Sequence, residues 1–71
     1  MQISQSQAEK ILTGEHAFSL WSFSMLITRL KGVYARDPSQ EVLDTCTVEL
    51  NMFLKKFDNI MGSDVTLVEK L

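Results

Sequence analysis

The 71-residue chain is poor in the residues with which small domains build covalent or metal cross-links. It has one cysteine, one histidine, one proline and three glycines. One cysteine excludes an internal disulfide, and one cysteine with one histidine is a poor ligand set for a metal. The glycines are isolated and form no phosphate-cradling loop. A domain of this size buries only about 60% of its unfolded surface, so we expect a protein partner to add to its stability.

Basic residues and long apolar runs are also scarce. Seven Lys and Arg against nine Asp and Glu give a net charge of −2, which would repel a polyphosphate backbone, so we expect no nucleic-acid partner. The longest uncharged stretch, Ala17 to Thr28, is interrupted by serines and is shorter than the roughly 20 residues of a membrane span. The opening Met1-Gln2-Ile3-Ser4 does not read as a secretory signal, and a lone thiol suits a reducing compartment. We therefore expect no membrane span and a cytoplasmic location.

Apolar residues recur at alternating steps of three and four, which predicts two long helices. The predicted helices cover residues 15–34 and 38–61, and the short segment Ala35-Arg36-Asp37-Pro38 reverses the chain between them. Two apolar stripes would face each other in this antiparallel hairpin: His16, Leu20, Phe23, Ile27, Leu30 and Tyr34 on the first helix, and Leu43, Cys46, Leu50, Phe53, Phe57 and Ile60 on the second.

Capping signals mark the ends of these helices. Asp37 is the expected N-cap of the second long helix, Pro38 its first residue, and Gly62 its end. A short helix is predicted over residues 3–13, where Ser4 with Gln7 has capping-box spacing, and it should end at Gly14.

The short helix would pack through the apolar side that Ala8, Ile11 and Leu12 form. Residues 63–71 are expected to fray as a tail or to form one last turn. The sequence thus predicts a single all-α domain over residues 1–71, with a bundle completed by dimerisation or by a partner.

No arrangement of reactive residues indicates an enzyme. In the predicted register His16 and Cys46 lie about 16 Å apart along the hairpin, too far for a shared metal or an activated thiolate. The carboxylates scatter over caps and solvent faces and form no close pair for acid and base catalysis. We expect no catalytic residues, no metal and no cofactor.

The residues that point to binding are large and apolar. On a helix over residues 15–34, Phe18, Trp21 and Met25 form a second stripe away from the main one, and Val48 and Met52 form a small patch on the far side of the returning helix. Aromatic residues and methionine are enriched at interface centres. These five residues are the candidate partner-binding surface. The alternative is that the second stripe packs under the short helix as core.

Several short segments resemble a known family. They are Gly14-Glu15-His16-Ala17, the spaced Leu20 and Leu30, Ala35-Arg36 followed by Pro38, and Glu49-Leu50 with Leu54. Together they resemble the small helical-hairpin co-chaperones of type III secretion needle assembly. The resemblance implies a bacterial, cytoplasmic co-chaperone that docks through one side of its hairpin on a larger tetratricopeptide-like chaperone. With that chaperone it would keep the needle subunit from polymerising before export.

A different class of function fits the same two-sided hairpin. Two copies could stack their remaining apolar sides into a homodimeric four-helix bundle and act as a regulatory or structural protein. The two hypotheses differ in what covers the second stripe. The sequence leaves both open.

Overall fold

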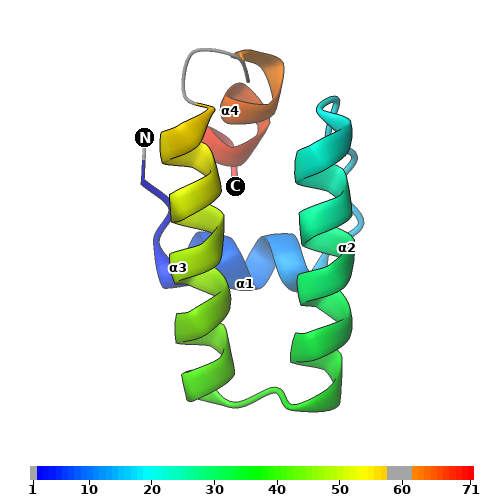
Figure 1. Ribbon diagram of the computed structural model, residues 1–71, viewed down its shortest axis with the longest axis vertical. Helices are drawn as coiled ribbons and strands as arrows, with labels where there is room; N and C mark the ends of the chain where they lie inside the picture. The colour runs from blue at the N-terminus through cyan, green and yellow to red at the C-terminus, as the bar shows by residue number, and fades with distance from the viewer. Residues whose placement is uncertain (1, 58–61) are drawn as a thin grey trace.

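The computed structural model describes residues 2–57 and 62–71, and within them all regular structure is α-helical. The helices are α1 (Gln5–Thr13), α2 (Trp21–Arg36), α3 (Gln40–Lys56) and α4 (Gly62–Glu69). Figure 1 shows α2 and α3 side by side and antiparallel, α1 crossing behind them, and α4 at the end of the hairpin away from its loop. The predicted all-α class is confirmed.

The loop of the hairpin leads into α3 through a serine cap. The Ser39 hydroxyl accepts a hydrogen bond from the Val42 backbone N–H at 3.2 Å. Ser39 has an extended backbone, as an N-cap requires, so Pro38 precedes the cap instead of starting the helix. The prediction of Asp37 as the cap is wrong, because Ser39 is the residue whose hydroxyl reaches the free amide.

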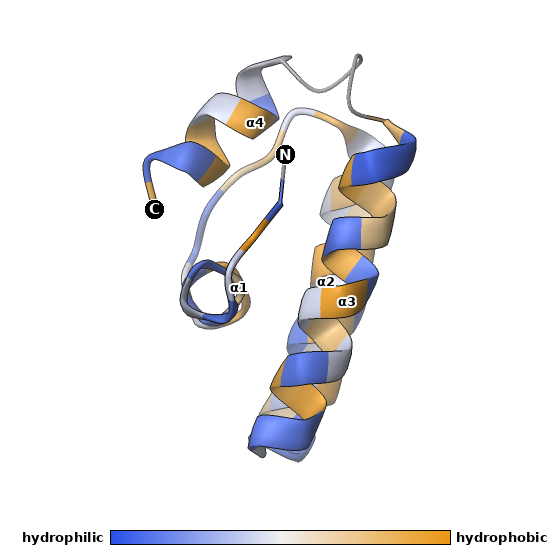
Figure 2. Ribbon diagram, turned by 90° about the vertical axis from the view of Figure 1, so that its left-hand side faces the viewer, coloured by the Kyte–Doolittle hydropathy of each residue, from blue (hydrophilic) through white to orange (hydrophobic). Residues whose placement is uncertain are grey.

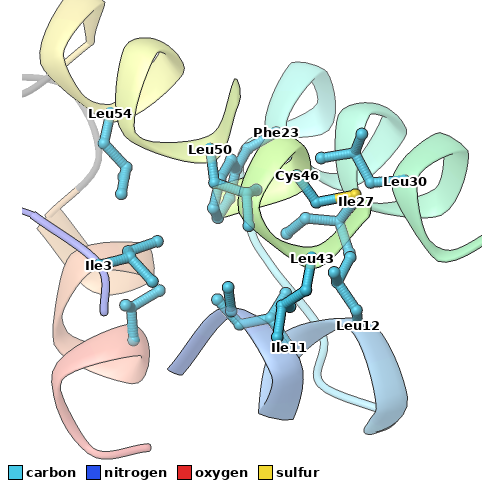
Figure 3. Close-up of a cluster of buried hydrophobic side chains, with 12 residues drawn as sticks. Ile3, Ile11, Leu12, Phe23, Ile27, Leu30, Leu43, Cys46, Leu50 and Leu54 are labelled. Atoms are coloured by element: carbon cyan, nitrogen blue, oxygen red, sulfur yellow. The ribbon is translucent and has the colours of Figure 1, made fainter. Parts of the chain in front are cut away.

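Helix α1 packs across one side of the hairpin. Its capping box is the predicted one: the Ser4 hydroxyl accepts from the Gln7 N–H, and the Gln7 side chain accepts from the Ser4 N–H. Its predicted apolar residues Ala8, Ile11 and Leu12 are all buried. Figure 3 shows the α1 side chains meeting those of α2 and α3 in one cluster.

The core also includes the N-terminal segment that precedes α1. Ile3 is buried, and the side chain of Asn51 on α3 forms hydrogen bonds with both its N–H and its carbonyl group. The Ile3 N–H donates to Asn51 Oδ1 at 2.5 Å, and Asn51 Nδ2 donates to the Ile3 carbonyl at 3.0 Å. Through these two hydrogen bonds, the polar side chain of Asn51 holds the backbone of the segment before α1 against α3.

The first long helix is shorter than predicted: it begins at Trp21 and not at residue 15, and it ends at Arg36. The reason is the crossing of α1. Lys31 Nζ donates to the Gly14 carbonyl at 2.6 Å, so the chain leaves α1 beside the middle of α2, about 15 Å of helix from where α2 begins. Residues 15–20 cover this distance in an irregular conformation, which can span about 20 Å when extended.

The C-terminal residues differ from the predicted tail. Gly62 begins α4 and does not close α3, and residues 63–71 are mostly helical. Helix α3 is described as far as Lys56, and the predicted continuation to residue 61, with Ile60, lies outside the described residues. Val68 is fully buried in the core, so α4 is part of the domain.

One carboxylate of α4 binds the backbone of the two residues that precede α2. Leu20, the N-cap of α2, has no side-chain oxygen. Asp64 is 3% exposed, and its carboxylate accepts from the Ser19 N–H at 2.5 Å and from the Leu20 N–H at 2.7 Å. A residue far along the chain therefore fixes the two residues before α2, next to the positive end of its dipole.

Candidate protein-binding face

The hairpin has one side that the other described helices leave uncovered. In Figure 2, α1 and α4 lie on the same side of α2 and α3, and the opposite side of the hairpin carries no further described element. We call this side the outer hairpin face. It comprises Met25, Leu26 and Arg29 of α2 and Glu49, Met52, Phe53 and Lys56 of α3. Trp21, the first residue of α2, lies at the margin of this face, one turn before Met25.

Large apolar side chains project from this face. Trp21 is 74% exposed, Met25 52% and Met52 67%. Trp21 and Met25 lie one turn apart on α2 and thus on the same side of that helix. Burying such side chains against a partner stabilises the complex by roughly 1.5–3 kcal/mol each, which makes this face the strongest candidate for an interface.

The projecting side chains flank two shallow hollows. Leu26 and Phe53, both half-buried, contribute to both of them. One hollow has a volume of about 400 Å³ and is bordered by Met25, and the other has about 330 Å³ and is bordered by Met52. Apolar floors with projecting rims suit the side chains of another helix laid along the hairpin.

A third hollow of about 370 Å³ lies at the loop end of the hairpin. Val33 and Val42 contribute apolar walls, and the acidic side chains of Asp37 and Glu41 border it. Because Arg29 lines all three hollows, they form one groove along the hairpin. Midway along this groove Arg29 pairs with Glu49 at 3.5 Å.

The charges of the groove differ between its ends. Asp37 and Glu41 make the loop end acidic, whereas Lys56 lies at the open end. The Arg29 and Glu49 pair in the middle is more than 40% exposed on both sides, so it adds little to folding stability. Its role in the face is to set the charges that an occupant meets.

Of the five predicted partner-binding residues, Phe18 does not share this face. It lies in the irregular segment before α2, half-buried against the core, with its ring centroid 5.0 Å from that of Phe23 in a T-shaped pair. Phe23 in turn stacks on Phe53 at 5.4 Å. The predicted stripe of Phe18 with Trp21 and Met25 is wrong, because it required a helix through residue 18.

The two residues predicted on α3 are both exposed. Met52 borders the groove, and Val48, 57% exposed, lies one turn before it on the same helix without lining any of the three hollows. The structure therefore places Met25 and Met52 beside the groove and leaves Trp21 and Val48, which line none of the three hollows, at the margin of the outer hairpin face.

The groove contains residues that the sequence analysis did not assign to binding. Leu26 was left out of both stripes, and Phe53 was placed only in the core stripe. Arg29 and Glu49 are not among the predicted binding residues, and the predicted hairpin register does not place them opposite each other. Their common feature is a position between the buried and the exposed sides of a helix.

The only thiol of the chain is a poor nucleophile in this fold. Cys46 is 1% exposed, and burial, with a smaller contribution from the Glu49 carboxylate, raises its pKa. The thiol is thus protonated and covered at neutral pH, while reactivity needs an accessible thiolate. Over residues 2–57 and 62–71, no group of three or more His, Cys, Asp or Glu side chains is arranged to hold a metal ion.

Comparison with known proteins adds no assignment. No family model matches the chain, and neither a curated protein nor a solved structure matches it significantly. Among the described helices, none has the length and apolar character needed to cross a membrane.

Proposed function

We propose that the chain is a non-enzymatic protein-binding module that recognises another polypeptide through its outer hairpin face. One observation carries the proposal: Met25 of α2 and Met52 of α3 are exposed beside the groove of the outer hairpin face, and Trp21 is exposed one turn before Met25. Trp is among the residues that contribute most to binding energy when an interface covers it, and the half-buried floor beneath offers pockets for a partner's side chains.

The narrower role that we propose is that of a small cytoplasmic co-chaperone for a type III secretion needle subunit, acting with a larger chaperone. It rests on the resemblance of residues 14–57 to that family. A hairpin with one covered and one uncovered side suits such a role, because a docked chaperone would take the uncovered side.

The test compares two alanine variants with the wild type in binding and in helicity. Trp21→Ala should weaken the binding of a protein partner about 30-fold, equivalent to about 2 kcal/mol at an interface centre. Circular dichroism should remain that of the wild type. Thr13→Ala, an exposed position on α1 away from the groove, is the matched control and should bind normally.

The partner itself is sought by affinity capture with the tagged chain and mass spectrometry, followed by titration with the purified candidate. Recovery of a tetratricopeptide-like chaperone with a needle subunit, dependent on Trp21, would support the narrower role. A captured partner that binds Trp21→Ala as tightly as the wild type would contradict the proposed face.

A further inference from the structure

The two ends of the outer hairpin face complement each other. At the open end Met25 and Met52 project beside the groove, with Lys56 next to Met52. The loop end has the opposite character: a hollow of about 370 Å³ with apolar walls and two acidic residues at its border. One end therefore offers projecting apolar side chains and a positive charge, and the other offers a cavity and negative charges.

Such a surface can bind itself. In a two-fold symmetric interface the same patch is used twice, so that a residue contacting a second residue of the partner is matched by the reciprocal contact. A two-fold axis that lies in the face, at right angles to the helices and near Arg29 and Glu49, lays the open end of one copy over the loop end of the other.

We propose that a second copy of this chain occupies the outer hairpin face in antiparallel orientation and completes a four-helix bundle. The inference rests on the proposed function, since it uses the same binding face. In this arrangement α2 lies against α2 and α3 against α3, which brings Met25 of one copy to the Val33 wall of the other. Lys56 comes opposite Glu41, and the contact occurs twice.

The charges at the two ends of the groove favour this orientation over the parallel one, although the axis places Arg29 and Glu49 each opposite its own copy. An axis along the helices would bring the two loop ends together and place both copies of Asp37 and Glu41 at one end of the bundle. Like charges held close together destabilise an interface, and opposite charges favour the orientation that pairs them. The antiparallel dimer separates the acidic ends and gives each a lysine.

A homodimer on this face also regulates access to it. Any other protein that binds the groove must displace the second copy, so the dimer protects Trp21 and the methionines from water and from unspecific contacts until a partner competes. Because the competition depends on concentration, dilution should free the face.

The experiment is a charge exchange between two variants, measured by sedimentation equilibrium. Lys56→Glu and Glu41→Lys should each weaken self-association about tenfold, because each homodimer then has two like-charge contacts. An equimolar mixture of the two variants should dimerise as the wild type does, since both contacts of the mixed dimer are again opposite in charge. Lys55→Glu, on the same helix but outside the groove, is the matched control and should dimerise normally.

The outcomes separate this inference from the proposed function. A wild-type monomer at hundreds of micromolar overturns the inference, as does a mixture that dimerises no better than its components. An equal loss with Lys55→Glu also overturns it, because a general effect of net charge would then explain the result. In each case the Trp21→Ala binding test still decides whether another protein uses the face. Circular dichroism of all variants checks that the hairpin stays folded.

Discussion

The carboxylate of Asp64 should contribute more to stability than any other polar side chain of the domain. It satisfies two backbone N–H groups at the start of α2, and both bonds involve a charged acceptor. Hydrogen bonds to charged groups contribute roughly 1.5–3 kcal/mol each. At the lower figure for both bonds, Asp64→Ala should lower the free energy of unfolding by about 3 kcal/mol. A chain of this length has a total stability of only about 4–10 kcal/mol.

Denaturant unfolding followed by circular dichroism measures this loss, and the fluorescence of Trp21, the residue after Leu20, reports on the start of α2. The melting temperature should fall by about 10–20 °C. Asp64→Asn should lose about 2 kcal/mol, because one oxygen still accepts while the amide group opposes the second N–H.

Asp37→Ala is the matched control for Asp64→Ala. Asp37 is exposed and α3 is capped by Ser39, so this change should cost less than about 1 kcal/mol. If Asp64→Ala were no more destabilising than Asp37→Ala, the stabilising role of the Asp64 hydrogen bonds to Ser19 and Leu20 would be refuted.

Three further changes test the packing. Phe23→Ala should lower the free energy of unfolding by about 3–5 kcal/mol in denaturant titrations, because the ring is fully buried. Asn51→Ala should cost about 2 kcal/mol and speed hydrogen exchange at Ile3, whose backbone groups it leaves unpaired. Cys46 should react with a thiol reagent only as fast as the domain opens. Because burial raises its pKa, the folded state binds the proton more tightly, so stability should be constant at neutral pH and fall as alkaline pH rises through the folded pKa, whereas Cys46→Ala should show no such fall.

The hairpin and the capping box of α1 could be predicted because they depend on local patterns. The three-and-four spacing of Phe23, Ile27 and Leu30 and the matching residues of α3 marked the buried sides, and Ser4 with Gln7 marked the start of α1. Ile3 was beyond reach, because its burial depends on Asn51, which is distant in the sequence and chemically ordinary.

The error at residues 15–20 has a long-range cause. His16 and Leu20 fit the helical period, so periodicity extended α2 through them. The direction of α1 prevents this extension. Helix α1 crosses the hairpin and ends beside the middle of α2, so the chain must run back along α2 before Trp21 can begin that helix. Asp64 stabilises that return by accepting the amides of Ser19 and Leu20, and no local signal announces either contact.

The same long-range contacts decide which predicted binding residues remain available. With a helix through residue 18, Phe18 and Trp21 would share a side and would be covered or exposed together. The irregular segment turns Phe18 into the ring cluster with Phe23, while Trp21, as the first residue of α2, stays on the side that α1 does not reach. Periodicity reveals which residues share a face, but whether that face is covered depends on the angle at which another helix crosses it. Here the crossing of α1 leaves the groove of Leu26 and Phe53 open along the hairpin, and that groove is where the proposed partner would fit.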